Sequence, residues 1–482
     1  MEAVLQVVQR INFYLSDYIL VFLLIGTGLY FSVRTRFVQV RCFGEGMRSV
    51  FGEFNMRGGR QKGGLSSFQA LTTAIAAQVG TGNIIGACGA ILLGGPGAIF
   101  WMWIIAFFGM ATIYAEAVLA QETRRVAEDG SVSGGPVYYI KRAFPGRFGT
   151  FLAGFFAVAL ILALGFMGCM VQSNSIGETC AAAFGVPSWA VGIAVAVLAA
   201  VVFLGGIQRI AGVTEKLVPV MAALYLLGGL VVLVCRIRYL PEAVGMIFRY
   251  AFVPNAIIGG SLGYALKMAV SQGVKRGLFS NEAGMGSAPN AAAAADVSHP
   301  VKQGLVQMLS VFIDTILICS TTAFMLLLSG VPIDAYSEGM NFVQAAVHSQ
   351  VGPFGPLFIT VSIFLFAFSS LVGNYYYTES NFRFIRDSKT GLLVFRLTCV
   401  AAIFIGAQMS FSMVWDLADV LMGLMALVNL VAILLLGGKA IRVLKDYQKQ
   451  RRAGKNPVYR YDEVGVGSPE IWNEAHAKKW ED

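Results

Sequence analysis

Charged side chains are scarce in this sequence: they make up 13% of its 482 residues, whereas 56% of the residues are hydrophobic. A soluble globular protein carries about 25% charged residues, so this composition excludes that class. Histidine is also scarce, with three residues, and the seven cysteines include no pair spaced C-x-x-C. Histidine- or cysteine-based metal, haem and disulfide sites are therefore excluded, and we expect no cofactor.

Eleven apolar stretches are long enough to cross a bilayer, which takes about 20 residues per helix. The sequence therefore predicts an all-α polytopic protein of the cell membrane, with lipid as a partner, no nucleic-acid partner and no obligate protein partner. The expected spans are 13–33, 66–93, 97–121, 149–177, 188–207, 215–235, 258–294, 304–330, 354–380, 391–410 and 415–437.

Lysine and arginine concentrate in alternate connections between these spans. One set of connections carries 25 basic residues, and the opposite set, with the N-terminal segment, carries four. Basic loops stay in the cytoplasm. The sequence therefore predicts an external N-terminus and a cytoplasmic C-terminus, with residues 438–482 as a cytoplasmic tail.

Two of the spans are interrupted by glycine and polar residues. One reads AQVGTGNIIG around Gly80, and the other reads LFSNEAGMGSAPN around Glu282, roughly 200 residues later. Each is followed by four further spans, so residues 1–65 precede a five-helix unit (66–237) and a second unit (258–437) that enters from the opposite face. Paired interruptions in two inverted halves indicate the binding site of a transporter.

The first interruption offers backbone groups that a ligand can satisfy. Amides at the start of the following half-helix carry positive partial charge and suit a carboxylate, and the small Gly80 and Gly82 allow close approach. Carbonyls of residues 76–79 suit a small hard cation such as sodium, and Thr81 and Asn83 add side-chain oxygens. The alternative interpretation is that these glycines only allow close helix packing.

Ionisable and polar side chains at membrane depth are further candidates. Glu282 could carry a proton, contact a substrate ammonium group or pair with a neighbouring donor, whereas Glu116 and Asp314 are expected to be buried hydrogen-bond partners. Gln172 could face a central cavity or bond to another helix. The adjacent hydroxyls of Ser369 and Ser370 could complete an oxygen shell for a cation or bond to their own helix.

Three segments carry a specific resemblance to a known family. They read GGLSSFQALTTAIAAQVGTGNIIG, GGPGAIFWMWIIAFFGMATIYAEAVLA and GLFSNEAGMGSAPNAAAAA. They resemble the signature segments of the alanine or glycine:cation symporters, the sodium:alanine symporter family, and the likeness extends over nearly the whole chain. The resemblance implies a LeuT-type 5+5 inverted repeat with one extra N-terminal helix. It also implies sodium-coupled import of a small neutral amino acid.

The resemblance assigns roles to individual residues. It implies that the substrate carboxylate meets the backbone of Gly80, Thr81 and Gly82, and that Gln172 lies near the amino group. Phe279, Ser280 and Asn281 would contribute to the pocket, with Phe279 limiting side-chain size. A sodium site would use the carbonyls of Ala76 and Val79 with Ser369, Ser370 and a carbonyl near Phe366, and a second cation would lie near Asn83.

The chain departs from the family pattern at Asn374, where alanine-type members tend to carry a bulky aromatic residue. Asparagine would enlarge and polarise the pocket, so glutamine or asparagine competes with alanine and glycine as the expected substrate. We therefore predict a symporter that works by alternating access and is not an enzyme. The alternatives are a proton-coupled carrier that uses Glu282 and a channel.

Overall fold

The computed structural model describes residues 2–52, 65–126, 132–253, 262–336, 339–409 and 411–480. Residues 258–261 at the expected start of the second unit, and Arg57, Arg60 and Lys62 of the basic loop, lie outside the described residues.

Helices account for nearly all of the described chain. The first part contains α1 (Glu2–Tyr14), η1 (Leu15–Ile19), α2 (Leu20–Arg34), α3 (Val38–Arg41), α4 (Phe43–Gly52), α5 (Ser67–Gln78), η2 (Gly82–Gly86), α6 (Ala87–Gly94), α7 (Gly97–Thr123), α8 (Pro136–Ala143), α9 (Gly146–Leu160), η3 (Ile161–Gly168), α10 (Cys169–Phe184), α11 (Ser188–Phe203) and α12 (Gly206–Cys235). A two-stranded antiparallel hairpin, β1 (Arg125–Val126) and β2 (Val132–Ser133), lies between α7 and α8.

Among the described residues of the second part, the regular elements are all helices. It contains η4 (Ile237–Tyr239), α13 (Leu240–Phe252), α14 (Leu262–Asn281), α15 (Pro289–Ala294), α16 (Pro300–Val311), η6 (Phe312–Cys319), α17 (Ser320–Leu327), η7 (Ile333–Ala335), α18 (Gly339–Val351), α19 (Phe354–Ile385), α20 (Lys389–Gly406), α21 (Phe411–Arg452), α22 (Tyr461–Val464) and α23 (Glu474–Lys478).

Seven helices within the described residues are long and apolar enough to cross a membrane, and a bent pair adds an eighth. This confirms a polytopic helical protein. Judged by length and composition, however, the described residues contain fewer membrane-spanning helices than the eleven expected. The expected spans 13–33 and 188–207 correspond to helices of 15 and 16 residues, α2 and α11. The expected span 258–294 is divided into α14 and the six-residue α15.

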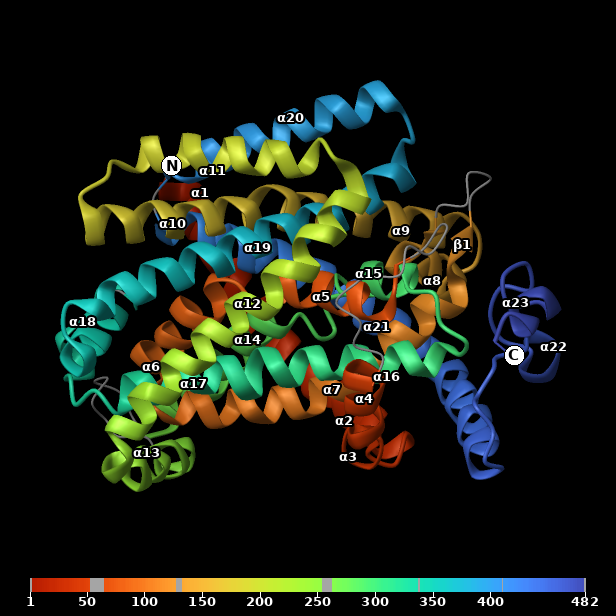
Figure 1. The fold of residues 1–482 in the computed structure, drawn as a ribbon, viewed down its shortest axis with the longest axis horizontal. Helices are drawn as coiled ribbons and strands as arrows, with labels where there is room; N and C mark the ends of the chain where they lie inside the picture. The colour runs from red at the N-terminus through yellow and green to blue at the C-terminus, as the bar shows by residue number, and fades with distance from the viewer. Residues whose placement is uncertain are drawn as a thin grey trace.

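Long helices lie side by side across the molecule, and the interrupted ones occupy its centre (Figure 1). In this view α10, α11 and α20 lie along one side, α7, α16 and α17 lie along the other, and α5, α14, α19 and α21 pass between them. The most apolar stretch of α7 is 67% buried within the protein, whereas that of α12 is 28% buried. Helix α7 is therefore interior, and α12 presents most of its surface outward.

Both expected interruptions are present. A capping box of Ser66 and Gln69 starts α5, which ends at Gln78, and the chain continues into η2 and α6 after a bend of 53°. The second interruption separates α14 from α15. There the φ angle is positive at Glu282 (+58°), Gly284 (+89°) and Gly286 (+84°), a conformation that glycine adopts without the steric cost that other residues carry.

Candidate functional site

The first interruption redirects three backbone amides away from their helical partners. In a continuous helix Gly80, Thr81 and Asn83 would donate to the carbonyls of Ala76, Ala77 and Val79. Instead Gly80 N–H donates to Asn83 Oδ1 (2.9 Å), Thr81 N–H donates to Gln172 Oε1 (3.1 Å) and Asn83 N–H donates to the Gly80 carbonyl (3.2 Å). Three carbonyls therefore lose their helical donors at one place in the protein interior.

Two hydroxyls of α19 meet these released carbonyls. Ser370 Oγ donates to the Ala77 carbonyl (2.8 Å), and Ser369 Oγ lies 3.3 Å from the Val79 carbonyl and 2.8 Å from that of Phe366. Both serines are fully buried. The predicted cluster of serines and carbonyls is thus assembled, except that Ser370 contacts the carbonyl of Ala77 and not that of Ala76.

Helices α10 and α19 bring two side-chain amides to the same region. A methyl group placed on Gly80 would collide with Ser370 Oγ and lie 3.0 Å from Gln172 Oε1, so this glycine allows the close approach of both groups. Asn374 lies one turn after Ser370 on α19. Its Nδ2 faces Gly168, which lies one turn before Gln172. The two amides therefore belong to facing surfaces of α10 and α19.

An aromatic pair covers the other side of the first interruption. A methyl group on Gly82 would lie 2.8 Å from the Phe279 ring, and this ring stacks on Trp415 at a centroid distance of 4.5 Å. Arg276 lies 5.0 Å from the centre of the Trp415 ring and pairs with Asp419 at 3.5 Å. The last turns of α14 are therefore fastened to α21 by stacking and by an ion pair.

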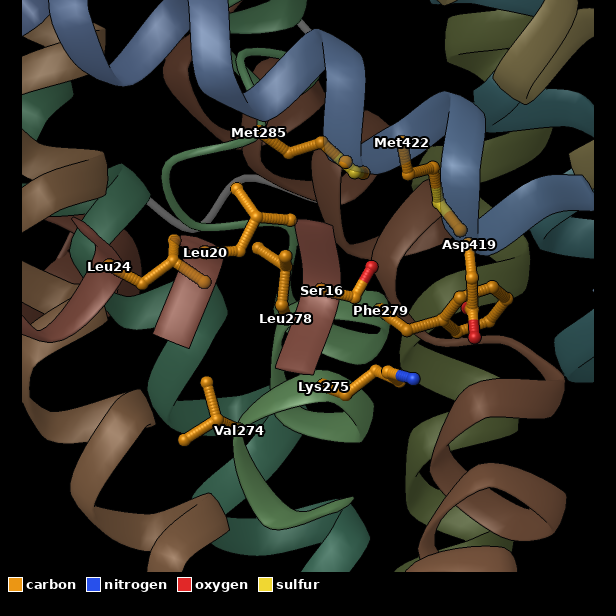
Figure 2. A pocket seen from close by; sticks show the side chains of 11 residues that line it. Ser16, Leu20, Leu24, Val274, Lys275, Leu278, Phe279, Met285, Asp419 and Met422 are labelled. Atoms are coloured by element: carbon orange, nitrogen blue, oxygen red, sulfur yellow. The ribbon is translucent and has the colours of Figure 1, made fainter. Parts of the chain in front are cut away.

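A cavity lies directly beside Phe279, between η1, α14 and α21 (Figure 2). Its volume is about 20 Å³, and its polar lining comes from Ser16, Lys275 and Asp419. Phe279 therefore both lines this cavity and lies against Gly82.

The buried carboxylate of Asp314 connects the two interruptions. Asn83 Nδ2 of the first donates to Asp314 Oδ1 (2.6 Å), and Ser280 Oγ of the second donates to Asp314 Oδ2 (2.8 Å). Thr315 Oγ1 also donates to Oδ2 (2.7 Å). A direct bond runs between the interruptions as well, from Gln78 Nε2 to the Asn281 carbonyl (2.7 Å). The two interruptions thus form one connected polar centre.

A second carboxylate holds the loop between α14 and α15. Glu116 of α7 accepts from the N–H of Gly284 (3.0 Å) and from Asn429 Nδ2, and Asn429 also donates to the Gly284 carbonyl (2.9 Å). Within the loop, Ser287 Oγ donates to Glu282. Glu116 and Glu282 therefore both have hydrogen-bond donors, as expected for buried carboxyl groups.

Several buried oxygens in this centre have no hydrogen-bond partner among the described residues. They are Thr81 Oγ1, Gln78 Oε1 and Asn374 Oδ1. Buried polar atoms are paired in most proteins, so these oxygens mark places where a polar ligand or water would be accommodated. No group of three or more histidine, cysteine, aspartate or glutamate side chains that could hold a metal occurs in the described ranges. The oxygens gathered here belong instead to carbonyls, hydroxyls and amides and to the separate carboxyl groups of Asp314, Glu116 and Glu282.

Comparison with known proteins assigns the chain to a family. Residues 1–461 match the sodium:alanine symporter family. The amino-acid carrier protein AlsT of Bacillus subtilis is 43% identical over 95% of this chain and 96% of its own length. The sodium/alanine symporter AgcS of Methanococcus maripaludis is 41% identical over 92% and 96%, and the probable sodium/glutamine symporter GlnT of Bacillus subtilis is 42% identical over 96% and 95%.

The chain belongs to the sodium:alanine symporter family. A solved structure of a manganese transporter from Eremococcus coleocola, bound to an aromatic bis-isothiourea compound, resembles this member of the family with a TM-score of 0.53. The match covers 81% of each chain at 14% sequence identity. This similarity shows a shared transporter fold and nothing about the transported substance.

Most residues that the sequence singled out in this family member lie in or beside the polar centre. Two participants were not predicted there: the side chain of Gln78, which bonds the second interruption, and Trp415, which stacks on Phe279. The carbonyl of Ala77, which meets Ser370, is one of the expected carbonyls of residues 76–79, although the resemblance named only those of Ala76 and Val79. Asp314 was expected to be only a buried hydrogen-bond partner. Its hydrogen bonds to both interruptions make it the centre of the network.

Proposed function

We propose that this protein is a secondary active symporter that imports a small neutral amino acid together with sodium by alternating access. Membership of the sodium:alanine symporter family supports this proposal, as do relatives named as sodium/alanine and sodium/glutamine symporters. The observation that carries it is the meeting of two interrupted helices in one buried polar centre, with released carbonyls beside the hydroxyls of Ser369 and Ser370. Such a protein moves its substrate and is not an enzyme.

The proposal includes a LeuT-type architecture with eleven spans. Residues 66–237 and 258–437 form two inverted five-helix units that follow an extra N-terminal helix, and the tail 438–482 is cytoplasmic while the N-terminus is external. Each proposed unit begins with one of the interrupted helices. Symmetric placement of two such helices near the middle of a membrane is typical of secondary transporters.

The substrate carboxylate binds the backbone amides of Gly80, Thr81 and Gly82. In the present conformation Gln172 Oε1 accepts a hydrogen bond from Thr81 N–H. A carboxylate oxygen of the substrate can take the place of Gln172 Oε1, and because it is charged it is the stronger acceptor. The released Gln172 side chain then contacts the substrate amino group through the same oxygen. Ser280 and Asn281 complete the pocket from the second interruption, and Phe279 limits the size of the substrate side chain.

Asn374 determines how polar a side chain the pocket accepts. Its Oδ1 atom is buried and has no partner among the described groups, so a substrate amide N–H₂ would satisfy it. Glutamine and asparagine therefore compete with alanine and glycine. A site that hydrogen-bonds a substrate group rejects analogues that lack the group more strongly than an apolar pocket does, so replacement of Asn374 by leucine should shift preference from glutamine to alanine.

The coupling sodium binds the carbonyls of Ala76 and Val79 and the hydroxyls of Ser369 and Ser370. The serine hydroxyls now donate to backbone carbonyls, which satisfies those oxygens when no cation is bound. When sodium binds, the hydroxyl hydrogens turn away and their lone pairs join the carbonyls around the ion. The Ala77 carbonyl, 2.8 Å from Ser370 Oγ, is an additional ligand of this set.

A second cation binds near Asn83, next to the carboxylate of Asp314. This carboxylate is fully buried and is contacted by three neutral donors, Asn83, Ser280 and Thr315. A buried negative charge without a cationic partner is strongly unfavourable. A cation beside Asp314 would neutralise it and join the two interruptions through one ion.

Uptake by the purified protein in liposomes tests the proposal. Labelled alanine and glutamine are offered with an inward sodium gradient, with a pH gradient alone and with neither, and each is competed with unlabelled amino acids. We expect saturable accumulation above the external concentration with sodium only. Accumulation driven by a pH gradient without sodium would instead support proton coupling through Glu282, and a flux that does not saturate would indicate a channel.

A further inference from the structure

The chain after α21 folds back onto the end of the helical body where α7 ends and α16 begins. We define residues 456–480, which include α22 and α23, as the strap. In Figure 1 α22, α23 and the C-terminus lie beyond α8, at that end of the molecule. Two contacts with Gln450 of α21 fix the beginning of the strap: Gln450 Nε2 donates to the Val458 carbonyl (3.0 Å), and Val458 N–H donates to Gln450 Oε1 (3.0 Å).

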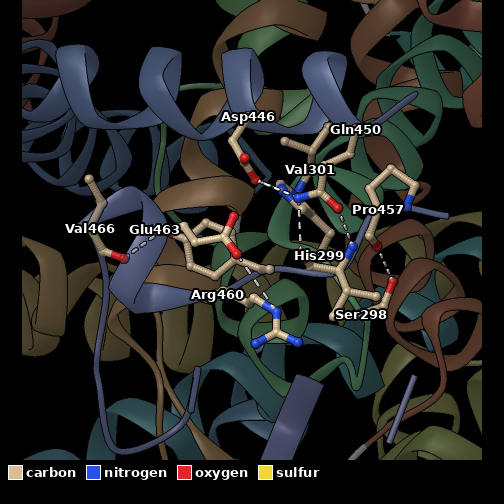
Figure 3. A network of polar contacts seen from close by, with 11 residues as sticks. Ser298, His299, Val301, Asp446, Gln450, Pro457, Arg460, Glu463 and Val466 are labelled. Atoms are coloured by element: carbon tan, nitrogen blue, oxygen red, sulfur yellow. Dashed lines mark hydrogen bonds and ion pairs between the residues drawn. The ribbon is translucent and has the colours of Figure 1, made fainter. Parts of the chain in front are cut away.

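The strap is hydrogen-bonded to a short segment, residues 296–299, that joins α15 to α16 and that we call the strip. Tyr459 N–H donates to the Ser298 carbonyl (2.9 Å), and Ser298 Oγ donates to the Pro457 carbonyl (2.9 Å). Figure 3 shows this corner, where the neighbouring His299 lies 3.2 Å from Asp446 of α21. The strip is thus fastened on one side to the strap and on the other to α21.

A buried tryptophan anchors the middle of the strap. Trp472 is fully buried, and its Nε1–H donates to the Gln121 carbonyl of α7 (3.2 Å). The Arg124 guanidinium lies 4.5 Å from the centre of the Trp472 ring. Large buried aromatic side chains dominate the energetics of such contacts, so this residue is the principal attachment of the strap to α7.

The strip also pairs with the start of the first interrupted helix. Leu65 N–H donates to the Ala294 carbonyl (2.9 Å), and Asp296 N–H donates to the Leu65 carbonyl (2.9 Å). The next residue, Ser66, caps α5. Movement of the start of α5 away from α15 and the strip must therefore break the hydrogen bonds of Leu65 with Ala294 and Asp296, and the strap holds the strip in place.

We propose that the strap is a built-in latch that holds the α5 end of the transport pathway closed until the strap or the strip yields. This inference rests on the proposed transport function, because it assigns the latch to one step of alternating access. With the strap in place, separation of α5 from the strip requires loss of both Leu65 hydrogen bonds against a fixed partner. Without it, the strip is no longer held, the two hydrogen bonds of Leu65 open more often, and opening at this end becomes faster.

His476 makes the attachment sensitive to pH. Its Nε2 lies 3.1 Å from the Val297 carbonyl, and the charged groups facing it are Arg124, which follows α7, Asp296 of the strip and Lys479 of the strap. Burial, followed by the nearby positive charge of Arg124, lowers the pKa of His476 to about 4. The docked strap therefore holds a neutral histidine, whereas a released strap would take up a proton below about pH 6.5.

Substitution of Trp472 by alanine tests the latch in the full chain. Trp189→Ala is the matched control. Trp189 is 56% exposed on α11, and none of the strap contacts described above involves α11. Hydrogen exchange of the amides of Leu65 and Asp296 reports on the pairing, and efflux of labelled alanine and glutamine from loaded liposomes reports on opening. We expect Trp472→Ala to lower protection at both amides at least tenfold and to raise efflux at least twofold, and Trp472→Phe to restore most of the protection.

Unchanged protection in Trp472→Ala, or lower protection with unchanged efflux, would overturn the latch. A chain shortened after Gly454 provides a second variant, and the point substitution decides the outcome if that shortened chain does not fold. Absence of alanine and glutamine transport by the unaltered protein would reject the proposed function, whereas the exchange measurement would still show whether the strap holds the strip.

Discussion

Replacement of Ser370 by alanine should weaken sodium dependence more than amino-acid selectivity. The Ser370 hydroxyl is fully buried, donates to the Ala77 carbonyl at 2.8 Å and lies against the backbone of Gly80. In the proposed sodium site it contributes one of the oxygen ligands. Alanine fits the same space, so the substitution removes the oxygen without adding bulk.

The size of the effect depends on what the Ser370 hydroxyl does without sodium and with sodium. Without sodium, the variant leaves the Ala77 carbonyl without the Ser370 donor, and an unsatisfied buried group costs about 1–3 kcal/mol. With sodium, the variant loses a direct ligand, an interaction with a charge and therefore stronger than a neutral hydrogen bond. The first effect offsets part of the second. A net loss of about 1–2 kcal/mol in sodium binding corresponds to a roughly five- to thirtyfold higher half-saturating sodium concentration.

Initial uptake rates at increasing sodium concentration measure this shift, at saturating alanine and then at saturating glutamine. Ser362→Ala is the matched control, because Ser362 is also buried on α19 and donates to a carbonyl of its own helix, that of Phe358 (2.8 Å). The ratio of alanine to glutamine uptake should stay within about twofold in both variants. A sodium activation curve for Ser370→Ala that coincides with that of the unaltered protein would refute the assignment of Ser370 as a ligand.

Three further outcomes are expected. Gly82→Val should abolish uptake while the protein still inserts and folds, because the Cβ atom alone would lie 2.8 Å from the Phe279 ring; uptake assays with purified, monodisperse protein check this. Asp314→Asn should lower the number of sodium ions moved per amino acid, measured from reversal potentials, and an unchanged ratio would exclude a cation at Asp314. Protection of the Leu65 amide, corrected for intrinsic exchange, should fall as the pH drops from 6.5 towards 4, because release of the strap allows His476 to bind a proton; His476→Gln should lose this dependence.

The interruptions could be predicted from the sequence because glycine, asparagine and serine at membrane depth contradict the surrounding apolar pattern. The same reasoning found Ser369, Ser370 and Gln172, whose polar groups stand out in apolar helices. It did not find the central position of Asp314, since 231 residues separate it from Asn83. A hydrophobicity pattern shows that a carboxylate is unusual at such a depth, but only the packing of helices decides which donors surround it.

The number of spans was less predictable for a related reason. Composition identifies apolar stretches, but α2 and α11 contain only 15 and 16 residues, and α14 ends where the backbone turns at Glu282. The strap was expected only as a polar cytoplasmic tail. Its docking depends on single aromatic side chains, Tyr459 and Trp472, which have no periodic neighbours that would reveal a buried face.

The two interruptions are held in physically different ways, and this difference assigns them different tasks. At the first, released backbone groups are bonded to uncharged side chains, Gln172 and Ser370, that can turn to accept a ligand. At the second, the Gly284 N–H is bonded to the buried carboxylate of Glu116, and its carbonyl to Asn429. Bonds to a buried charge are stronger and costlier to break than neutral ones. For the proposed transport cycle we therefore expect ligand exchange at the first interruption, with the second as the fixed wall of the proposed site.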